Sequence, residues 1–244
     1  MKGLLSAVNL YSLISQKTLS AISRQNRQHR KMCSAINRFD KSNFRSYCDV
    51  LSSKDADLAA VIKRYGYPPI WTRAASFPTL IRIILEQQVS LASAKAAFSQ
   101  LRKKIGVVTP VKLLNLSDAE LKGCYFSRQK IIYSKQLARA ITQGQLSFNQ
   151  LKRLPADKIR QNLKTIKGIG DWTVDIFLMM CLQHTDIFPA ADIALIKSVK
   201  EVKELPAQIS IKEVLLIAEN WRPLRTIAAY ILYHAYLSKR NRVG

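Results

Sequence analysis

The sequence predicts an all-α protein on three observations. Hydrophobic residues make up 48% of its 244 residues, whereas it has only 8 glycines and 8 prolines, a composition typical of a helix-rich globular chain. Apolar residues recur at spacings of three and four along much of the chain, which is the period of a helix with one buried face. Helix-start signals precede two of these segments, namely Pro78 and the capping box Ser117-Asp118-Ala119-Glu120.

The first expected helices are a short one over Asp55–Tyr65, which Tyr67-Pro68-Pro69 ends, and a long one over Phe77–Leu101. The long helix contains the polar run Glu86-Gln87-Gln88. Because a buried amide without a partner costs free energy, we expect an amide here to bond to the backbone of a neighbouring helix.

Further helices are expected over residues 119–123, 131–142, 157–166, 172–183, 212–220 and 227–237, with another beginning at Asp192. Between two of them, Lys167-Gly168-Ile169-Gly170 indicates a tight turn, because glycine adopts positive φ without steric cost. We expect positive φ at both glycines, with Ile166 and Ile169 packed inside the turn. A helix N-terminus has exposed N–H groups, so this turn is expected to bind a phosphate.

The charge balance indicates a polyanionic partner. There are 39 Lys and Arg against 16 Asp and Glu, a net charge of +23. Residues 1–39 hold seven basic residues and no acidic one, so 23 minus 7 leaves +16 on the remainder. Nucleic acid fits best, because basic side chains that neutralise phosphates release counterions. A solvated basic surface is the alternative.

The cysteines suggest neither a metal site nor a disulfide framework. Cys33, Cys48, Cys124 and Cys181 lie too far apart in sequence for a zinc knuckle or an iron–sulfur loop. Their spacing suits a reducing compartment, so we expect an intracellular protein of the cytoplasm or nucleoid with no cofactor and no metal ion. No apolar run approaches the roughly 20 residues of a membrane span, so no membrane partner is expected.

Residues 1–45 are predicted to form a basic N-terminal extension, either flexible or targeting. They are rich in Ser, Arg and Gln and contain no acid before Asp40, which is typical of an organellar transit peptide. A poorly folded leader, or an upstream start codon wrongly included, is equally compatible. A targeting role would place the protein in an organelle or the nucleus, and residues 46–244 form the expected folded domain.

Gly168-Ile169-Gly170-Asp171-Trp172-Thr173, with Asp192 22 residues after Gly170, resembles the helix-hairpin-helix DNA glycosylase superfamily, and most closely its 3-methyladenine DNA glycosylase II branch. Gln87-Gln88-Val89-Ser90 and Trp221-Arg222-Pro223-Leu224-Arg225-Thr226 are similar to two further elements of that superfamily, so the resemblance covers roughly residues 75–237. It implies two helical lobes with a helix-hairpin-helix motif and a cleft between them.

The resemblance also implies an activity, monofunctional hydrolysis of the N-glycosidic bond of alkylated purines in double-stranded DNA, performed by a monomer. Asp192 matches the catalytic Asp, although it could simply cap its helix. Trp172 and Tyr233 match aromatics that line the base pocket, where core packing is the alternative. Trp172 also stands where relatives that cleave the strand have a lysine, so no lyase step is expected. Ile176 replaces a tyrosine of the family, which leaves the lesion spectrum open.

DNA contacts are expected from the hairpin and from one further turn. Lys164, Lys167, Gly168, Gly170 and Thr173 form the expected hairpin set. In the superfamily, the turn that corresponds to residues 124–130 carries a wedge side chain that enters the duplex. Matching places Arg128 there in place of a leucine, and Phe126 and Gln129 stay open as wedges, with phosphate contact as the other role for Arg128. Two alternatives remain for the whole chain: another damaged-base specificity, or a DNA-binding protein without enzymatic activity.

Overall fold

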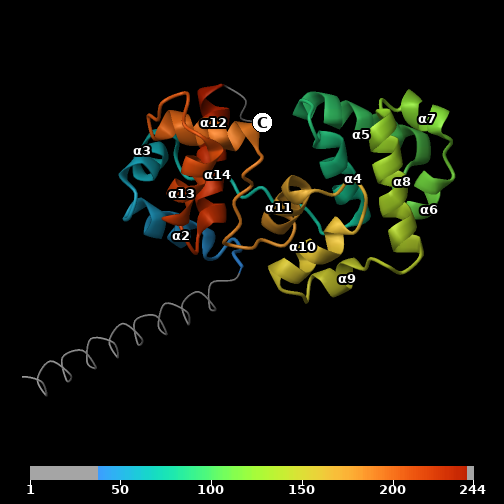
Figure 1. Ribbon diagram of the computed structural model, residues 1–244, viewed down its shortest axis with the longest axis horizontal. Coiled ribbons are helices and arrows are strands. Elements are labelled where there is room, and N and C mark those ends of the chain that lie inside the picture. The colour runs from blue at the N-terminus through green and yellow to red at the C-terminus, as the bar shows by residue number, and fades with distance from the viewer. Residues whose placement is uncertain (1–37, 241–244) are drawn as a thin grey trace, which may run out of the picture. The chain divides into compact units, whose positions relative to one another are not determined.

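The structure, a computed structural model, describes residues 38–240, which belong to one compact unit. The expected N-terminal extension therefore lies largely outside the described residues. Within them the fold is all-α, as predicted, with one isolated β-bridge between Arg38 and His184 (Figure 1). The helices are α2 (Phe44–Ser52), α3 (Ala56–Tyr65), α4 (Phe77–Glu86), α5 (Leu91–Ile105), α6 (Pro110–Leu114), α7 (Asp118–Gly123), α8 (Arg128–Thr142), α9 (Phe148–Leu151), α10 (Ala156–Lys164), α11 (Asp171–Met180), α12 (Ile193–Val202), α13 (Ile211–Glu219) and α14 (Arg225–Lys239).

The main helix contacts fall into two sets. In the first, α14 packs against α2, α3 and α12, and α13 packs against α12. In the second, α4 contacts α5, α8 and α11, while α8 contacts α6 and α7, and α10 contacts α11. These two sets correspond to the two lobes that the resemblance implied. The cleft between the lobes stays a prediction.

An aromatic cluster begins the folded unit. The rings of Phe39 and Phe44 each lie 5.5 Å from the ring of Tyr230 in α14, between centroids. Both phenylalanines are buried, and such burial of large rings is a strong contribution to stability. The compact unit accordingly starts at Arg38, before residue 46, where the sequence placed the boundary.

The prediction of one long helix over residues 77–101 is wrong, because the structure contains two helices there. Gln87 leaves the helical region with ψ of 124°, and Gln88 has a left-handed φ of 56°. Ser90 then caps α5, its hydroxyl accepting a hydrogen bond from the N–H of Ser93 at 3.1 Å. A serine cap is a strong helix-start signal, but it was hidden inside a continuous apolar pattern.

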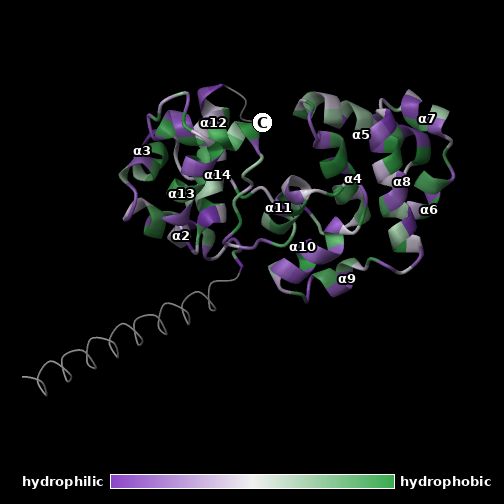
Figure 2. Cartoon of the chain, in the orientation of Figure 1, coloured by the Kyte–Doolittle hydropathy of each residue, from purple (hydrophilic) through white to green (hydrophobic). Residues whose placement is uncertain are grey.

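Two helices, α11 and α14, have long runs of consecutive buried residues. Residues 173–179 of α11 are all buried, as are residues 226–232 of α14. Figure 2 shows that most other helices carry both hydrophobic and hydrophilic faces. The capping box at Ser117 and Glu120 is confirmed, and α2, α6 and α9 are helices that the apolar pattern did not predict.

Candidate DNA-binding and catalytic site

The hairpin joins α10 to α11 through a tight turn that Gly168 makes possible. Ile166 and Ile169 are buried inside the turn, as predicted, and the N–H of Ile169 donates to the carbonyl of Ile166 at 3.0 Å. Gly168 has φ of 94°, and a Cβ atom there would lie 2.0 Å from Cγ of the Tyr133 ring. Gly168 is therefore required by its own backbone conformation and by the ring of Tyr133 in α8.

Gly170 does not have the positive φ that the sequence analysis expected. It has φ of −95° and ψ of −176°, a conformation open to any residue, and a Cβ atom there would meet nothing within 4 Å. Neither backbone strain nor packing in the described residues requires glycine here. The absence of a side chain leaves the start of α11 open to a close partner, and α11 has no side-chain cap.

Gln87 fixes this turn from the other side. Its Nε2 atom donates to the carbonyl of Gly168 at 2.9 Å and to Oγ1 of Thr173 at 2.8 Å. The expected amide-to-backbone bond is thus confirmed for Gln87. Thr173 is only 1% exposed, so the expectation that it contacts DNA is wrong for its side chain, which faces the interior.

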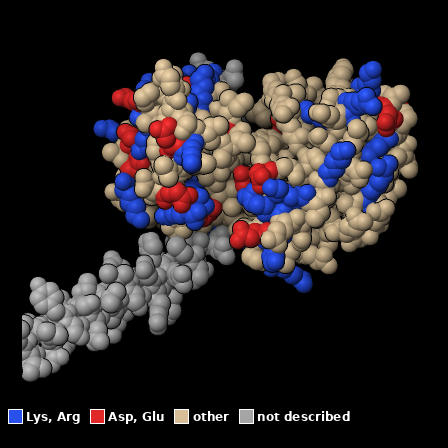
Figure 3. Space-filling view, viewed as in Figure 1, with Lys and Arg blue, Asp and Glu red and all other residues tan. Residues whose placement is uncertain are grey.

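The basic residues of the hairpin are partly neutralised by the protein itself. Nζ of Lys164 lies 2.8 Å from Oδ2 of Asp171, and Nη1 of Arg160 lies 2.9 Å from Oδ1 of the same carboxylate. Arg160 also pairs with the buried Asp175. Figure 3 shows acidic and basic side chains side by side in this region. The hydrogen bond from Lys164 lowers the pKa of Asp171, so this carboxylate remains negative where a phosphate is expected.

Lys167 differs from Lys164. It is exposed, and no hydrogen bond or ion pair holds its ammonium group within residues 38–240. Lys167 is therefore free to pair with a phosphate, as the sequence analysis expected, whereas Lys164 must first leave Asp171.

Asp171→Asn is expected to tighten duplex binding about threefold and to steepen the salt dependence by about one phosphate contact, because it frees Lys164, while Arg160 keeps its pair with Asp175. Fluorescence anisotropy at several salt concentrations measures both quantities. Asp157→Asn is the matched control, since Asp157 is exposed in the first turn of α10, at the opposite end from the hairpin. Equal effects of both substitutions would contradict the local role of Asp171.

Asp192 begins α12 and binds two partners at once. Its Oδ1 accepts a hydrogen bond from the N–H of Leu195 at 3.0 Å, and its Oδ2 accepts one from Nε1 of Trp172 at 2.9 Å. The capping role is therefore confirmed, and it fixes the carboxylate. Since Trp172 is the second residue of α11, the indole links the carboxylate directly to the helix that starts at the hairpin.

Tyr233 of α14 completes this group. Its hydroxyl oxygen is buried and makes no hydrogen bond to the described residues. Burial, and then the negative charge of Asp192, raise the pKa of Tyr233 well above its usual value, so the phenol remains protonated. The structure thus brings together Asp192, Trp172 and Tyr233, three residues that the sequence analysis selected from distant segments. Ile176, which replaces a family tyrosine, is buried in α11.

The turn between α7 and α8 holds the three candidate wedge residues, one of which is buried. Phe126 is 2% exposed and belongs to the core, so it is wrong as a wedge, while Arg128 and Gln129 are exposed at the start of α8. Tyr125, which the sequence analysis did not select, is 65% exposed and has a left-handed φ of 64°. Bulky residues rarely adopt that conformation, and such outliers gather at functional sites.

Tyr125 lies beside the turn that follows α4. With Val89 it lines a cavity of about 270 Å³, whose other lining residues include Leu85 and Lys130. Nζ of Lys130 donates to the carbonyl of Leu85 at 2.6 Å and so joins α8 to α4. The exposure of Tyr125 was not predictable, because the apolar pattern does not show which ring of this turn is buried and which is exposed.

Residues 38–240 lack a membrane-spanning helix and a cluster of metal-ligating side chains. None of their helices is long and apolar enough to cross a membrane. Within the same range, no group of three or more His, Cys, Asp or Glu side chains is arranged to hold a metal ion.

Comparison with known proteins places the chain in a family. Residues 81–223 match the model of the HhH-GPD superfamily of base excision DNA repair proteins. DNA-3-methyladenine glycosylase 1 of Schizosaccharomyces pombe is 28% identical over 190 residues, covering 75% of this chain and 83% of that protein. The DNA-3-methyladenine glycosylase of Bacillus subtilis is 28% identical over 169 residues, covering 64% of this chain and 56% of that protein. The chain spans 65% of the length of a second Bacillus subtilis relative, which is 27% identical.

Solved structures agree with these relatives. The Schizosaccharomyces pombe 3-methyladenine DNA glycosylase in complex with abasic DNA superposes with a TM-score of 0.71 at 27% identity, over 77% of this chain and 95% of that one. A DNA-3-methyladenine glycosidase of Bacillus halodurans gives a TM-score of 0.64 at 27% identity, over 78% and 88%. On the matched model, which spans more than half of its residues, the chain belongs to the HhH-GPD superfamily of base excision DNA repair proteins.

Proposed function

We propose that this chain is a monofunctional DNA glycosylase of the 3-methyladenine DNA glycosylase II type, which hydrolyses the N-glycosidic bond of alkylated purines in double-stranded DNA. The observation that carries the proposal is the hydrogen bond between Asp192 and Trp172, because it couples one carboxylate to the hairpin helix. The names of the relatives and of the solved neighbours support the same activity. The proposal includes action as a monomer, because the site as described needs no residue from a second chain.

The chemistry follows from the charge that develops on the sugar. As the base leaves with the bonding electron pair, positive charge builds on the anomeric carbon, as in glycoside hydrolysis. The carboxylate of Asp192 stabilises that charge and takes a proton from the attacking water, whose oxygen forms the new bond to carbon. The products are the free base and an abasic site. Trp172 cannot form a Schiff base, so strand cleavage does not follow.

The aromatic residues act on the base and the water. A base must leave the stack before its sugar can be reached, and the faces of Trp172 and Tyr233 supply stacking for it. Alkylated purines carry positive charge, which an aromatic face attracts. The hydroxyl of Tyr233, which remains protonated and has no hydrogen-bond partner among the described residues, is available to donate to the attacking water.

A base-release assay tests this function. Duplexes carrying 3-methyladenine, hypoxanthine or an oxidised base are incubated with the protein, and the free bases and any strand breaks are measured separately. Release of 3-methyladenine without strand cleavage is expected. If another base is released preferentially, the protein is a glycosylase with that specificity. If no base is released, the protein only binds DNA.

We assign the wedge to Tyr125, whose exposed ring fills the space that an everted nucleotide leaves in the duplex. Tyr125→Ala is expected to slow base release from duplex DNA about tenfold, because unstacking costs a few kcal/mol, but to leave release from single strands within about twofold. Arg128→Ala is the comparison variant. It is expected to weaken duplex binding and reduce its salt dependence, as loss of a phosphate contact does. If Arg128→Ala instead slowed base release from duplexes and Tyr125→Ala only weakened duplex binding, Arg128 would be the wedge.

A further inference from the structure

Asp192 is carried by a segment that runs from the end of α11 to the start of α12. This segment has few backbone bonds of its own: the N–H of His184 donates to the carbonyl of Leu178 at 3.0 Å, and the N–H of Asp192 donates to the carbonyl of Pro189 at 3.0 Å. The N–H of Leu195 and Nε1 of Trp172 bind the carboxylate directly, while the position of the backbone that carries it depends on what holds the middle of the segment.

The first turn of α14 binds that middle part. The backbone N–H of Thr226 donates to the carbonyl of Thr185 at 2.9 Å, and the Thr226 hydroxyl accepts from the N–H of Ile187 at 2.9 Å. The same hydroxyl lies 3.1 Å from the carbonyl oxygen of Ile187, to which it donates. Thr226 is fully buried, so these bonds are shielded from water.

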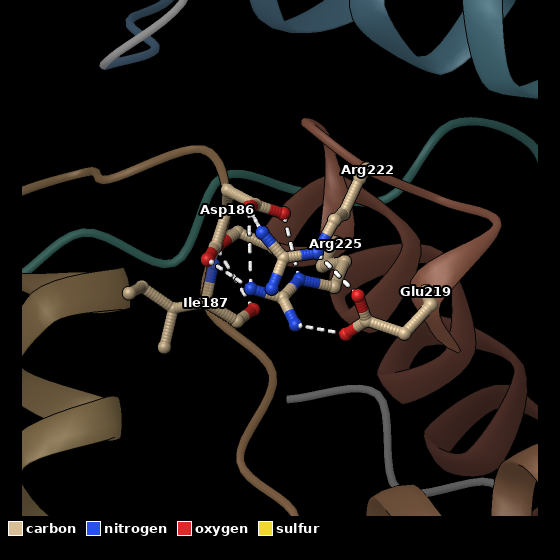
Figure 4. Close-up of polar contacts among 6 residues, drawn as sticks. Asp186, Ile187, Glu219, Arg222 and Arg225 are labelled. Atoms are coloured by element: carbon tan, nitrogen blue, oxygen red, sulfur yellow. Dashed lines mark hydrogen bonds and ion pairs between the residues drawn. The ribbon is translucent and has the colours of Figure 1, made fainter. Parts of the chain in front are cut away.

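Arg225 holds the residue between them, as Figure 4 shows. Its Nε donates to Oδ1 of Asp186 at 2.7 Å, while its Nη2 donates to Oδ2 and to the backbone carbonyl of Asp186, each at 3.1 Å. Nη1 donates to Oε1 of Glu219 at 2.7 Å. The Arg225 side chain is 17% exposed. Three bonds to one residue use the planar guanidinium fork, which a lysine cannot reproduce.

A displacement at Asp186 would be transmitted to Asp192. Ile187 and Phe188 are buried, and the ring of Phe188 lies 5.9 Å from that of Trp221. Pro189, which follows, has a fixed φ. Well-packed side chains and a fixed backbone angle leave little freedom to absorb movement between the two aspartates.

We propose that Arg225 is a positioning residue, which fixes the Asp192 carboxylate through the segment from Thr185 to Ala191. This inference rests on the proposed glycosylase activity. Arg225 itself touches no reacting group. It acts because a displacement of about 1 Å in a catalytic group can cost on the order of 100-fold in rate.

The test measures single-turnover base release from 3-methyladenine duplexes at saturating enzyme, duplex affinity and thermal unfolding. Arg225→Ala is expected to lower the rate about 30-fold and Arg225→Lys about fivefold, within the cost of misplacing a catalytic group, with affinity changed by less than about twofold. Arg240→Ala is the matched control, since Arg240 pairs with Glu201 at 2.6 Å near the far end of α14. It is expected to lower the melting temperature but leave the rate unchanged.

Combining Arg225→Ala with Asp186→Ala should lower the rate by less than the product of the two single effects, because both substitutions remove the bonds between Arg225 and the Asp186 carboxylate. Arg225→Lys is the informative variant if Arg225→Ala does not fold. If the wild type is active and both Arg225 variants release bases as fast as Arg240→Ala does, this inference is wrong but the proposed function stands. A wild type without base release would overturn the proposed function and this inference with it.

Discussion

Asp192→Asn is expected to reduce base release about 1,000-fold, which is within the range that a positioned acid or base contributes. Asparagine has the shape of aspartate and caps helices equally well, so its Oδ1 can keep the bond to the N–H of Leu195. It loses the charge that stabilises the sugar cation and the group that takes the proton from water. The variant should therefore fold normally but release bases far more slowly.

Duplex binding should be retained or tightened in the same variant, because a negative charge near the phosphates is removed. Single-turnover base release and fluorescence anisotropy measure the two effects separately, and Asp157→Asn again serves as the control for a simple change in net charge. If Asp192→Asn released 3-methyladenine at more than about one tenth of the wild-type rate, Asp192 would be only a helix cap.

Gly168→Ala is expected to lower the free energy of unfolding by about 3 kcal/mol, from backbone strain at positive φ and from overlap with a ring. The overlap is with Tyr133, whose Cγ would lie 2.0 Å from the new Cβ atom. For a domain of this size, the change corresponds to a melting temperature lower by roughly 8 °C. Thermal unfolding measures it. Adding Tyr133→Ala should recover the part caused by the overlap, and a melting temperature equal to that of wild type would contradict the assignment.

Gly170→Ser is the complementary variant. A Cβ atom at Gly170 meets no protein atom within 4 Å, and serine is a favourable helix cap, so the melting temperature should be unchanged or higher. The added hydroxymethyl group would occupy the space beside the first N–H groups of α11. Duplex affinity should fall about tenfold for unrelated sequences alike, because phosphate contacts carry no base information. Unchanged affinity would remove the start of α11 from the proposed DNA-binding surface.

Much of the hairpin could be predicted from local sequence. The two glycines, the buried isoleucines and the helices on either side follow from local signals, and the structure contains all of them. The different roles of the glycines did not follow, because Gly168 is constrained by Tyr133, a residue of another helix. The hydrogen bond to the buried Thr173 hydroxyl likewise comes from Gln87, which is 86 positions away.

The backbone conformations of the turns before α5 and α8 could not be predicted from local sequence. Gln88 and Tyr125 both adopt left-handed φ, although neither residue type favours it. Local propensity would continue the helix at Gln88 and would bury the ring of Tyr125. Each conformation exists because packing elsewhere holds the chain, so no short-range rule selects these residues.

The sequence by itself determined the helical class and the tight glycine turn at a helix start, because these depend on residue type, periodicity and short motifs. The acidic and aromatic residues proposed for the site followed from the resemblance of those motifs to a family. The tertiary structure alone decided which of those side chains reach the surface and what holds them there. Burial, ion pairing and backbone strain arise from contacts between packed helices and loops, as when Gln87 binds Thr173 or when Arg225 holds Asp186. Such contacts form only when the helices pack together.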